Sequence, residues 1–178
     1  MDFIFGTPLW KLPPKKFNQK KITEEIYRAK ESDPKGKKVS NIGGYHSGYD
    51  YLNIPLIDKY IKYRLEGEGG LDFPHEVSLR WFNINNRGDM NIPHDHGGQE
   101  GLSGVLFITD APGLTLGHPA QQISNSVPWF SAERYDIDGK AGEIVVFPSS
   151  IIHWVTPSES DDPRITVAFN VDVNWPKR

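Results

Sequence analysis

The feature that most constrains the fold is a series of short segments rich in β-branched and aromatic residues in the C-terminal two-thirds of the chain. Four of them span residues 76–84, 102–109, 143–147 and 164–173, and clusters of Gly, Pro, Asp and Asn separate them. Segments of this length and composition are typical of β-strands joined by turns. The 17 Gly and 14 Pro residues also interrupt the chain too often for a helical bundle. The sequence therefore predicts a mainly β fold with antiparallel strands.

Two helices are expected before these strands. Residues 22–32 (ITEEIYRAKES) are good helix formers and place Ile22, Ile26 and Ala29 at helical spacing. A second helix is expected from about residue 54 to residue 65, just before a glycine-rich stretch that begins at Gly67. The residues of this helix that we expect to face the core are Leu56, Tyr60, Tyr63 and Leu65.

A length of 178 residues favours a single domain, residues 1–178, with one sizeable core. We expect residues 1–70 to form a helical N-terminal support and residues 71–178 to form the β-barrel core. Short strands preceded by two helices predict a double-stranded β-helix, that is, a jelly roll or cupin-like barrel. The fold class is thus mainly β, with flanking helices packed outside one sheet.

The composition excludes several classes of function. The chain has no Cys, which excludes disulfides, thiolate metal ligands and Cys nucleophiles and fits a cytoplasmic protein. No stretch approaches the roughly 18 apolar residues that cross a bilayer, so no membrane partner is expected. Two lysine clusters lie within residues 1–40, but no aromatic residues interleave the second one, and nucleic acid is not an expected partner.

Two histidines one residue apart, His94 and His96, are the first candidates for chemistry. Residues i and i+2 of a strand point to the same face, so both imidazoles would project together while Asp95 points away. His153 lies in the apolar run IIHWV, where, taken alone, it would more simply be a core histidine bonded to the backbone. A small jelly roll would bring the three imidazoles together, and this favours a divalent metal site with open coordination positions.

Arg164 and Thr166 lie on the next predicted strand and share one of its faces, opposite Ile165. If His153 lines the barrel, both side chains should reach the same interior. A buried guanidinium needs an anion, and its two-pronged geometry fits a carboxylate, to which the threonine hydroxyl could add a hydrogen bond. The alternative interpretation pairs Arg164 with a protein acid such as Asp162.

Two stretches, WFNINNRGDMNIPHDHGGQEGLSGVLFI and GEIVVFPSSIIHWVTPSESDDPRITVAFNVDV, resemble the 2-oxoglutarate and Fe(II)-dependent oxygenase family found in bacteria and marine phages. FIFGTPLW and SNIGGYHS are similar to the opening segments of that family, so nearly the whole chain is covered. The resemblance implies a dioxygenase that hydroxylates an unactivated C–H bond of a peptide, amino acid or other small molecule. It also implies that the protein is located in the cytoplasm of a bacterium or of a phage-infected host cell.

The same resemblance implies the site residues and their ligands, with dioxygen as the second cosubstrate. They are the Fe(II) ligands His94, His96 and His153 and the 2-oxoglutarate contacts Arg164, Thr166 and Asn83. The chain departs from the broader superfamily at His96, where the usual ligand is Asp or Glu. Loss of that anion raises the charge of the site by one and should weaken Fe(II) retention, so that Zn, Ni or Cu could replace iron in the purified protein.

Two other functions remain open at this stage. A cupin-type metal enzyme without 2-oxoglutarate would use Glu100 as a fourth ligand, although Arg164 has no task in a cupin. A non-enzymatic jelly-roll structural or binding module would use its histidines only for hydrogen bonds. The connections 40–52 and 110–134 would flank the barrel mouth and decide specificity, and we expect their His46 and His118 to be exposed. The oligomeric state is open, with a homodimer as one alternative.

Overall fold

The structure is a computed structural model, which describes residues 6–49, 54–67, 69–96, 101–119 and 134–174. These residues contain the helices α1 (Gln19–Ser32) and α2 (Pro55–Leu65). The strands are β1 (Trp10–Leu12), β2 (Asn41–Ile42), β3 (Tyr45–His46), β4 (His75–Asn85), β5 (Met90–His94), β6 (Leu102–Phe107), β7 (Ala111–Gly117), β8 (Arg134–Gly139), β9 (Ile144–Pro148), β10 (His153–Val155) and β11 (Arg164–Val173).

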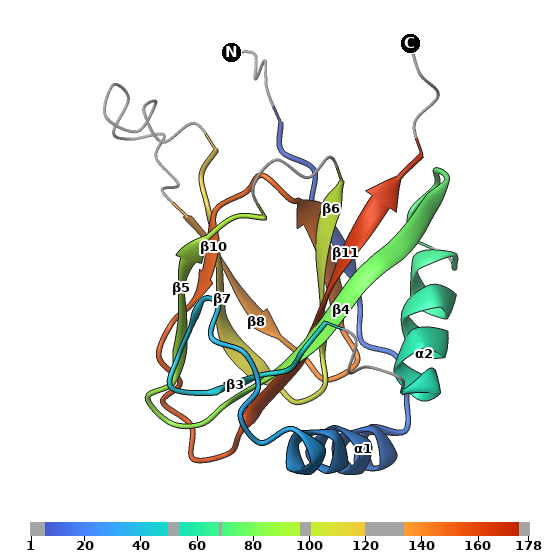
Figure 1. Cartoon of the computed structure of the whole chain (residues 1–178). Helices are drawn as coiled ribbons and strands as arrows, with labels where there is room; N and C mark the ends of the chain where they lie inside the picture. Colours follow the sequence, from blue (N-terminus) through green and yellow to red (C-terminus); the bar gives the residue numbers. More distant parts are fainter. Residues whose placement is uncertain (1–5, 50–53, 68, 97–100, 120–133, 175–178) are drawn as a thin grey trace, which may run out of the picture.

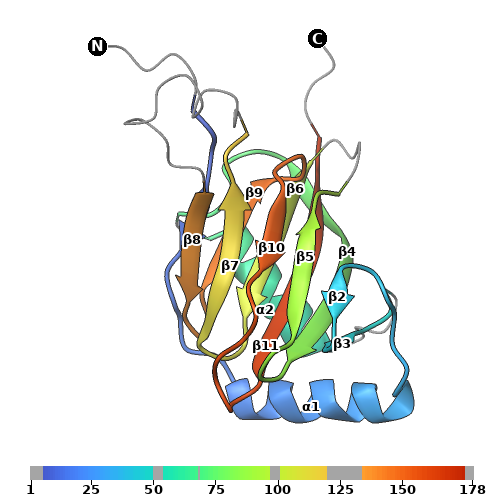
Figure 2. The ribbon, with the colours of Figure 1, turned by 90° about the vertical axis from the view of Figure 1, so that its left-hand side faces the viewer.

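The strands form two facing antiparallel sheets. The six-stranded sheet has the order β1-β9-β6-β11-β4-β3, and the five-stranded sheet has the order β2-β5-β10-β7-β8. Figure 1 shows α2 beside β4 and α1 across one end of the barrel, and Figure 2 looks onto the five-stranded sheet. This arrangement is the double-stranded β-helix with flanking helices that the strand pattern predicts.

Two hydrophobic cores hold the fold together, one on each side of the six-stranded sheet. The central strands β11 and β6 lie between them and are buried on both faces. One face of β11 turns Val167 and Phe169 towards the helices, where they cluster with Ile26 and Ile61. The other core lies between the sheets and contains residues of β6, β7, β8 and β9, including Phe107. Each fully buried side chain of this kind contributes about 2 kcal/mol to stability. The six-stranded sheet is therefore a layer fixed on both sides, which gives a rigid support for side chains that project into the barrel.

The two helices begin and end close to the predicted positions. Helix α1 begins three residues earlier than the apolar pattern suggests, because the side chain of Asn18 accepts a hydrogen bond from the backbone N–H of Lys21 (3.3 Å) and caps it. The prediction that Tyr63 of α2 faces the core is wrong, since its exposed fraction is 58%. Arg64 is buried in its place and donates to backbone carbonyls, which turns this helix about its axis relative to the predicted face.

Residues 10–46 also add short strands to both sheets. β1 pairs with β9, β2 with β5, and β3 with β4. The N-terminal segment thus contributes to the barrel walls as well as carrying α1. In the described part of the chain, no helix is long and apolar enough to span a membrane.

Candidate metal and cosubstrate site

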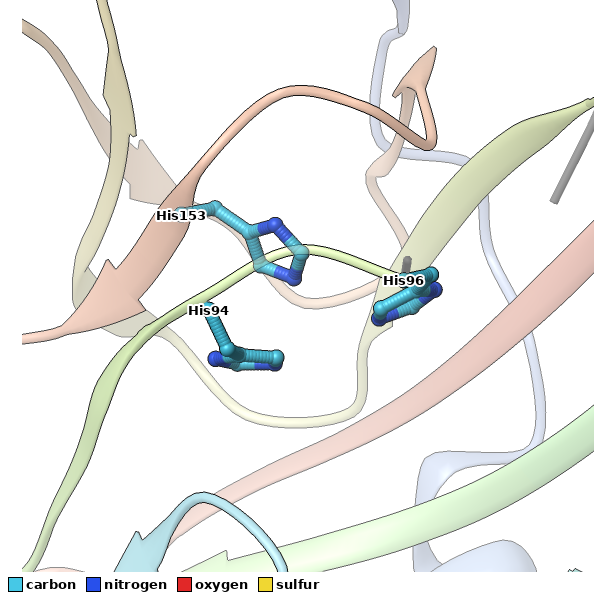
Figure 3. A group of neighbouring side chains, drawn as sticks. All are labelled: His94, His96 and His153. Atoms are coloured by element: carbon cyan, nitrogen blue, oxygen red, sulfur yellow. The ribbon is translucent and has the colours of Figure 1, made fainter. Parts of the chain in front are cut away.

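The three candidate histidines meet at the adjoining ends of two neighbouring strands of the five-stranded sheet. His94 ends β5, His153 begins β10, and the two are paired directly in the strand register. His96 follows two residues after His94, and each residue offers a ring nitrogen that lies within 4.8 Å of those of the other two. Figure 3 shows the three rings converging on a common space. This spacing allows the three imidazoles to share one metal ion.

Hydrogen bonds fix which nitrogen of each ring faces that space. The Nδ1 atoms of His94 and His153 lie 2.8 Å and 2.9 Å from the carbonyl oxygens of Ile92 and Ile151. A carbonyl only accepts, so each Nδ1 carries the proton and each Nε2 keeps its lone pair. Burial lowers the pKa of His153 to about 3 and also lowers the pKa of His96. Both rings are therefore neutral at pH 7, which is the form that binds a metal.

Arg164 projects from the six-stranded sheet into the same interior. It is 4% exposed, its Nη1 lies 3.4 Å from Oγ1 of Thr166, and its Nε has no hydrogen-bond partner in the part of the chain that the structure describes. Among the described residues no carboxylate lies within 4.0 Å of it, so the alternative pairing with Asp162 is not formed. Burial lowers the pKa of Arg164 to about 10, and the guanidinium is still charged at pH 7. An uncompensated cation thus faces the barrel interior.

A single cavity of about 360 Å³ between the sheets connects these groups. Asn83, opposite Thr166 in the register of β4 and β11, also lines it, and its buried Oδ1 has no hydrogen-bond partner among the residues described. The volume is in the range of small-molecule sites. The six residues predicted for the site all line this cavity: His94, His96, His153, Arg164, Thr166 and Asn83.

Aromatic side chains form a further wall of the cavity. The prediction that His46 is an exposed loop residue is wrong: it is 3% exposed, because β3 pairs with β4 and sets His46 opposite Asn83. Its ring stacks on Trp81 at 5.8 Å, and Tyr49 packs edge-on against Trp81 at 5.4 Å. All three residues of this aromatic wall, His46, Tyr49 and Trp81, line the cavity.

The remaining described candidates do not join the histidine cluster as metal ligands. Asp95 is exposed and does not belong to the group of ligand atoms, as its strand parity predicts. His118 is exposed, as expected. Glu100 and residues 120–133 of the long connection lie outside the described residues.

Sequence reasoning missed two contacts of His96. The Nδ1 atom of His96 lies 2.8 Å from Oδ1 of Asn170 and 2.8 Å from Oγ of Ser103. Asn170 carried a weak signal, since it shares strand parity with Arg164 and Thr166. Ser103 carried no signal for this contact, because its position relative to His96 depends on how β6 pairs with β11.

A jelly roll with three convergent imidazoles, and with a buried cation that pairs with no carboxylate among the described residues, defines a class of protein, metal-dependent enzymes that take an anionic cosubstrate. The family described as "Putative 2OG-Fe(II) oxygenase" matches residues 79–170, more than half of the chain. The chain therefore belongs to this family, and it is a 2-oxoglutarate-dependent non-haem iron oxygenase. Membership decides against the cupin-type enzyme without 2-oxoglutarate and against the structural module.

Solved structures share the fold at low sequence identity. The non-heme alpha ketoglutarate dependent carbocyclase SnoK from nogalamycin biosynthesis is 11% identical, with a TM-score of 0.70 over 93% of this chain and 79% of SnoK. A Pseudomonas putida prolyl-4-hydroxylase is 16% identical, with a TM-score of 0.65 over 95% of this chain and 94% of the other. HygX from Streptomyces hygroscopicus with nickel and 2-oxoglutarate bound is 9% identical, with a TM-score of 0.64 over 95% and 84%. A search of curated proteins finds no match.

Proposed function

We propose that this oxygenase is a hydroxylase of a peptide, an amino acid or another small molecule, and that its site is the cavity between the two sheets. The observation that carries the proposal is Arg164, a buried cation with no carboxylate partner among the described residues, which lines the same cavity as the three imidazoles. A metal and a dianionic keto acid would together satisfy both halves of the cavity.

His94, His96 and His153 would hold Fe(II) through their Nε2 atoms. The hydrogen bonds to Nδ1 keep each lone pair directed away from the backbone, so little reorganisation is needed on binding. Three protein ligands leave positions open for a chelating cosubstrate and dioxygen. With Fe(II) and 2-oxoglutarate bound, the site would use dioxygen to convert 2-oxoglutarate to succinate and CO₂ while one oxygen atom enters a substrate C–H bond.

Arg164 would bind the carboxylate of 2-oxoglutarate that lies away from the metal. A guanidinium and a carboxylate can form two parallel charge-assisted hydrogen bonds, and the free Nε of Arg164 is available for one of them. Thr166, on the same face of β11, would donate its hydroxyl proton, and Asn83 would add an amide contact. The apolar Leu114, Phe147 and Val155 also line the cavity and would keep water away from the reacting groups.

The aromatic wall would hold the substrate. Nδ1 of His46 lies 2.6 Å from the carbonyl oxygen of Ser47, so it carries the proton and Nε2 can accept a hydrogen bond. The amino group of Lys37 lies 4.3 Å from the centre of the Tyr49 ring and adds positive charge at this wall. A substrate with an N–H or O–H donor and a flat or anionic group fits this combination, and a peptide or amino acid supplies both.

A cytoplasmic location fits the absence of Cys from the chain.

The test is an anaerobic titration of the protein with Fe(II) and then 2-oxoglutarate, followed by visible absorption. The wild type should develop the weak charge-transfer band of the Fe(II) and 2-oxoglutarate chelate, and Arg164→Ala should lose it at the same cosubstrate concentration. Arg87→Ala, which removes an exposed arginine paired with Asp161, is the control and should keep the band. A wild type that binds Fe(II) without forming the band with 2-oxoglutarate would contradict the proposal.

Substrate classes can then be separated by succinate release in air. Capped peptides and free amino acids should raise succinate release above the level without substrate, and His46→Ala should reduce that rise while the charge-transfer band stays unchanged. If His46→Ala abolished the band as well, His46 would belong to the cosubstrate half of the cavity and not to a substrate wall.

A further inference from the structure

We propose that Ser103 and Asn170 are positioning residues that fix the tautomer and orientation of His96, and so set the metal affinity of the site. We call this pair the His96 clasp. The inference rests on the proposed role of His96 as a metal ligand, and it explains how a neutral histidine can serve where the broader superfamily uses a carboxylate.

The clasp is built by two strands of the sheet opposite His96. Ser103 on β6 and Asn170 on β11 face each other directly in the strand register. Each places an oxygen 2.8 Å from Nδ1 of His96. The hydroxyl of Ser103 also donates to Oγ of Ser149 at 3.2 Å, so Ser103 presents a lone pair to the imidazole. One N–H of His96 thus lies between two acceptors, and a proton on Nδ1 leaves Nε2 free for a metal.

His96 needs this support more than the other two histidines do. His94 and His153 each bond to the carbonyl two residues earlier in the chain, so their rings are fixed by their own strands. His96 lies beyond the end of β5, and its ring bonds to side chains 7 and 74 residues away. Without the clasp, the described contacts leave only ring packing against Trp81, at 5.6 Å between centroids, to orient this imidazole from the opposite sheet. Packing alone does not select a tautomer.

The clasp also connects the metal half of the site to the cosubstrate half. Asn170 lies on β11, the strand that carries Arg164 and Thr166, and all three side chains line the cavity. The other face of β11 packs against the helices through Val167 and Phe169, which holds this strand in place. The strand β11 therefore fixes both the orientation of His96 and the positions of Arg164 and Thr166.

The test measures metal affinity without cosubstrate and without turnover. Full-length protein freed of metal by a chelator is titrated with Ni(II) in competition with a chromophoric chelator. Loss of the outer hydrogen bonds to a metal-bound histidine weakens metal binding by about 10- to 100-fold, and we expect that range for Ser103→Ala/Asn170→Ala. In each single variant one acceptor can still hold the N–H of His96. The fold-loss of Ni(II) affinity in each single variant should therefore be smaller than the square root of the fold-loss in the double variant.

Two further variants sharpen the result. Asn170→Asp places a carboxylate against Nδ1–H and should bind Ni(II) more tightly than the wild type, because an anionic acceptor makes the imidazole a stronger donor to the metal. Asn85→Ala is the matched control: Asn85 is a buried asparagine, 1% exposed, whose amide bonds to Asn91 and not to a candidate ligand. Its Ni(II) affinity should equal that of the wild type.

Nitrogen-15 NMR of the imidazole rings in the metal-free protein gives an independent result. His96 should be in the Nδ1–H form in the wild type and should show the Nε2–H form in the double variant, with thermal melting used to verify folding. Retention of the Nδ1–H form together with Ni(II) affinity within threefold of the wild type would overturn the clasp. A wild type that binds no Ni(II) would overturn the metal-site proposal, and the NMR comparison would still decide whether the clasp sets the tautomer.

Discussion

Replacing Arg164 by methionine should make the protein more stable and at the same time abolish tight binding of 2-oxoglutarate. Arg164 is buried with no carboxylate partner in the described part of the chain, and burial lowers its pKa from the usual value to about 10. Each pKa unit corresponds to 1.36 kcal/mol, so the charged form is destabilised in the fold by about 3 kcal/mol. At neutral pH the guanidinium is charged in both folded and unfolded chains, and the whole penalty applies.

Methionine fills much of the same space and removes the charge, at the cost of the guanidinium carbon that lies 6.0 Å from the centre of the Phe107 ring. We therefore expect the free energy of unfolding, measured in urea without metal or cosubstrate, to rise by about 1 to 3 kcal/mol. The gain should be largest at neutral pH and should shrink above pH 10, where the wild-type penalty is relieved. In the presence of Ni(II), the Kd for 2-oxoglutarate should rise at least thirtyfold, since losing one partner of a buried charged pair costs about 2 to 5 kcal/mol.

Arg64→Met is the matched control. Arg64 is equally buried, 3% exposed, but it donates to the carbonyl oxygens of Gly142 at 2.8 Å and Pro13 at 2.6 Å and to the hydroxyl of Tyr60 at 2.9 Å. Its loss removes these three hydrogen bonds, although the Tyr60 hydroxyl still donates to Gly142 at 2.7 Å, and should destabilise the fold by about 1 to 3 kcal/mol. A loss of stability in Arg164→Met as large as that in Arg64→Met would show that burial of the Arg164 charge does not destabilise the fold.

Three other predictions follow from particular residues. Burial lowers the pKa of His153 to about 3, so below pH 6.5 the unfolded chain gains a proton that the folded chain lacks. The stability of the metal-free protein should therefore fall by up to about 1.4 kcal/mol per pH unit as the pH drops from 6.5 towards 3. In urea unfolding at pH 4 to 7, His153→Gln should reduce this slope. Asn83→Ala should weaken 2-oxoglutarate binding about tenfold in isothermal titration, from the loss of one buried amide contact, while Ni(II) affinity stays unchanged. Gly104→Ala should destabilise the fold by about 1 to 3 kcal/mol in urea, because the added methyl group overlaps the ring of Phe169; full stability would show that the two strands can separate at no cost.

Sequence reasoning works where the structure follows from residues close together in the chain. The spacing of His94 and His96 gives a shared face because alternation along a strand is a local property. The same alternation puts Arg164 and Thr166 on the face opposite Ile165, and they do line one cavity. The strands rich in Val, Ile and Phe are identifiable for the same reason, and so is the mainly β fold.

The features that sequence reasoning missed depend on how distant segments pair. His46 is buried because a two-residue strand, β3, joins the edge of β4, and two residues carry too little pattern to predict a strand. Ser103 meets His96 only through the register of β6 with β11. Tyr63 is exposed because the hydrogen bonds of Arg64 to distant carbonyls decide how α2 is rotated. Each of these outcomes is set by contacts between residues more than twelve apart in sequence or by strand register, which a local pattern does not contain.

Three imidazoles and one guanidinium, from opposite sides of the barrel, should bind a single metal and a single keto diacid. Crystals grown with Ni(II) and 2-oxoglutarate, with diffraction recorded at the nickel absorption edge, test it most directly. We predict one anomalous peak at about 2.1 Å from Nε2 of His94, His96 and His153, with the distal carboxylate of the cosubstrate hydrogen-bonded to Arg164. A metal bound without one of these histidines, or a cosubstrate that does not touch Arg164, would contradict the claim.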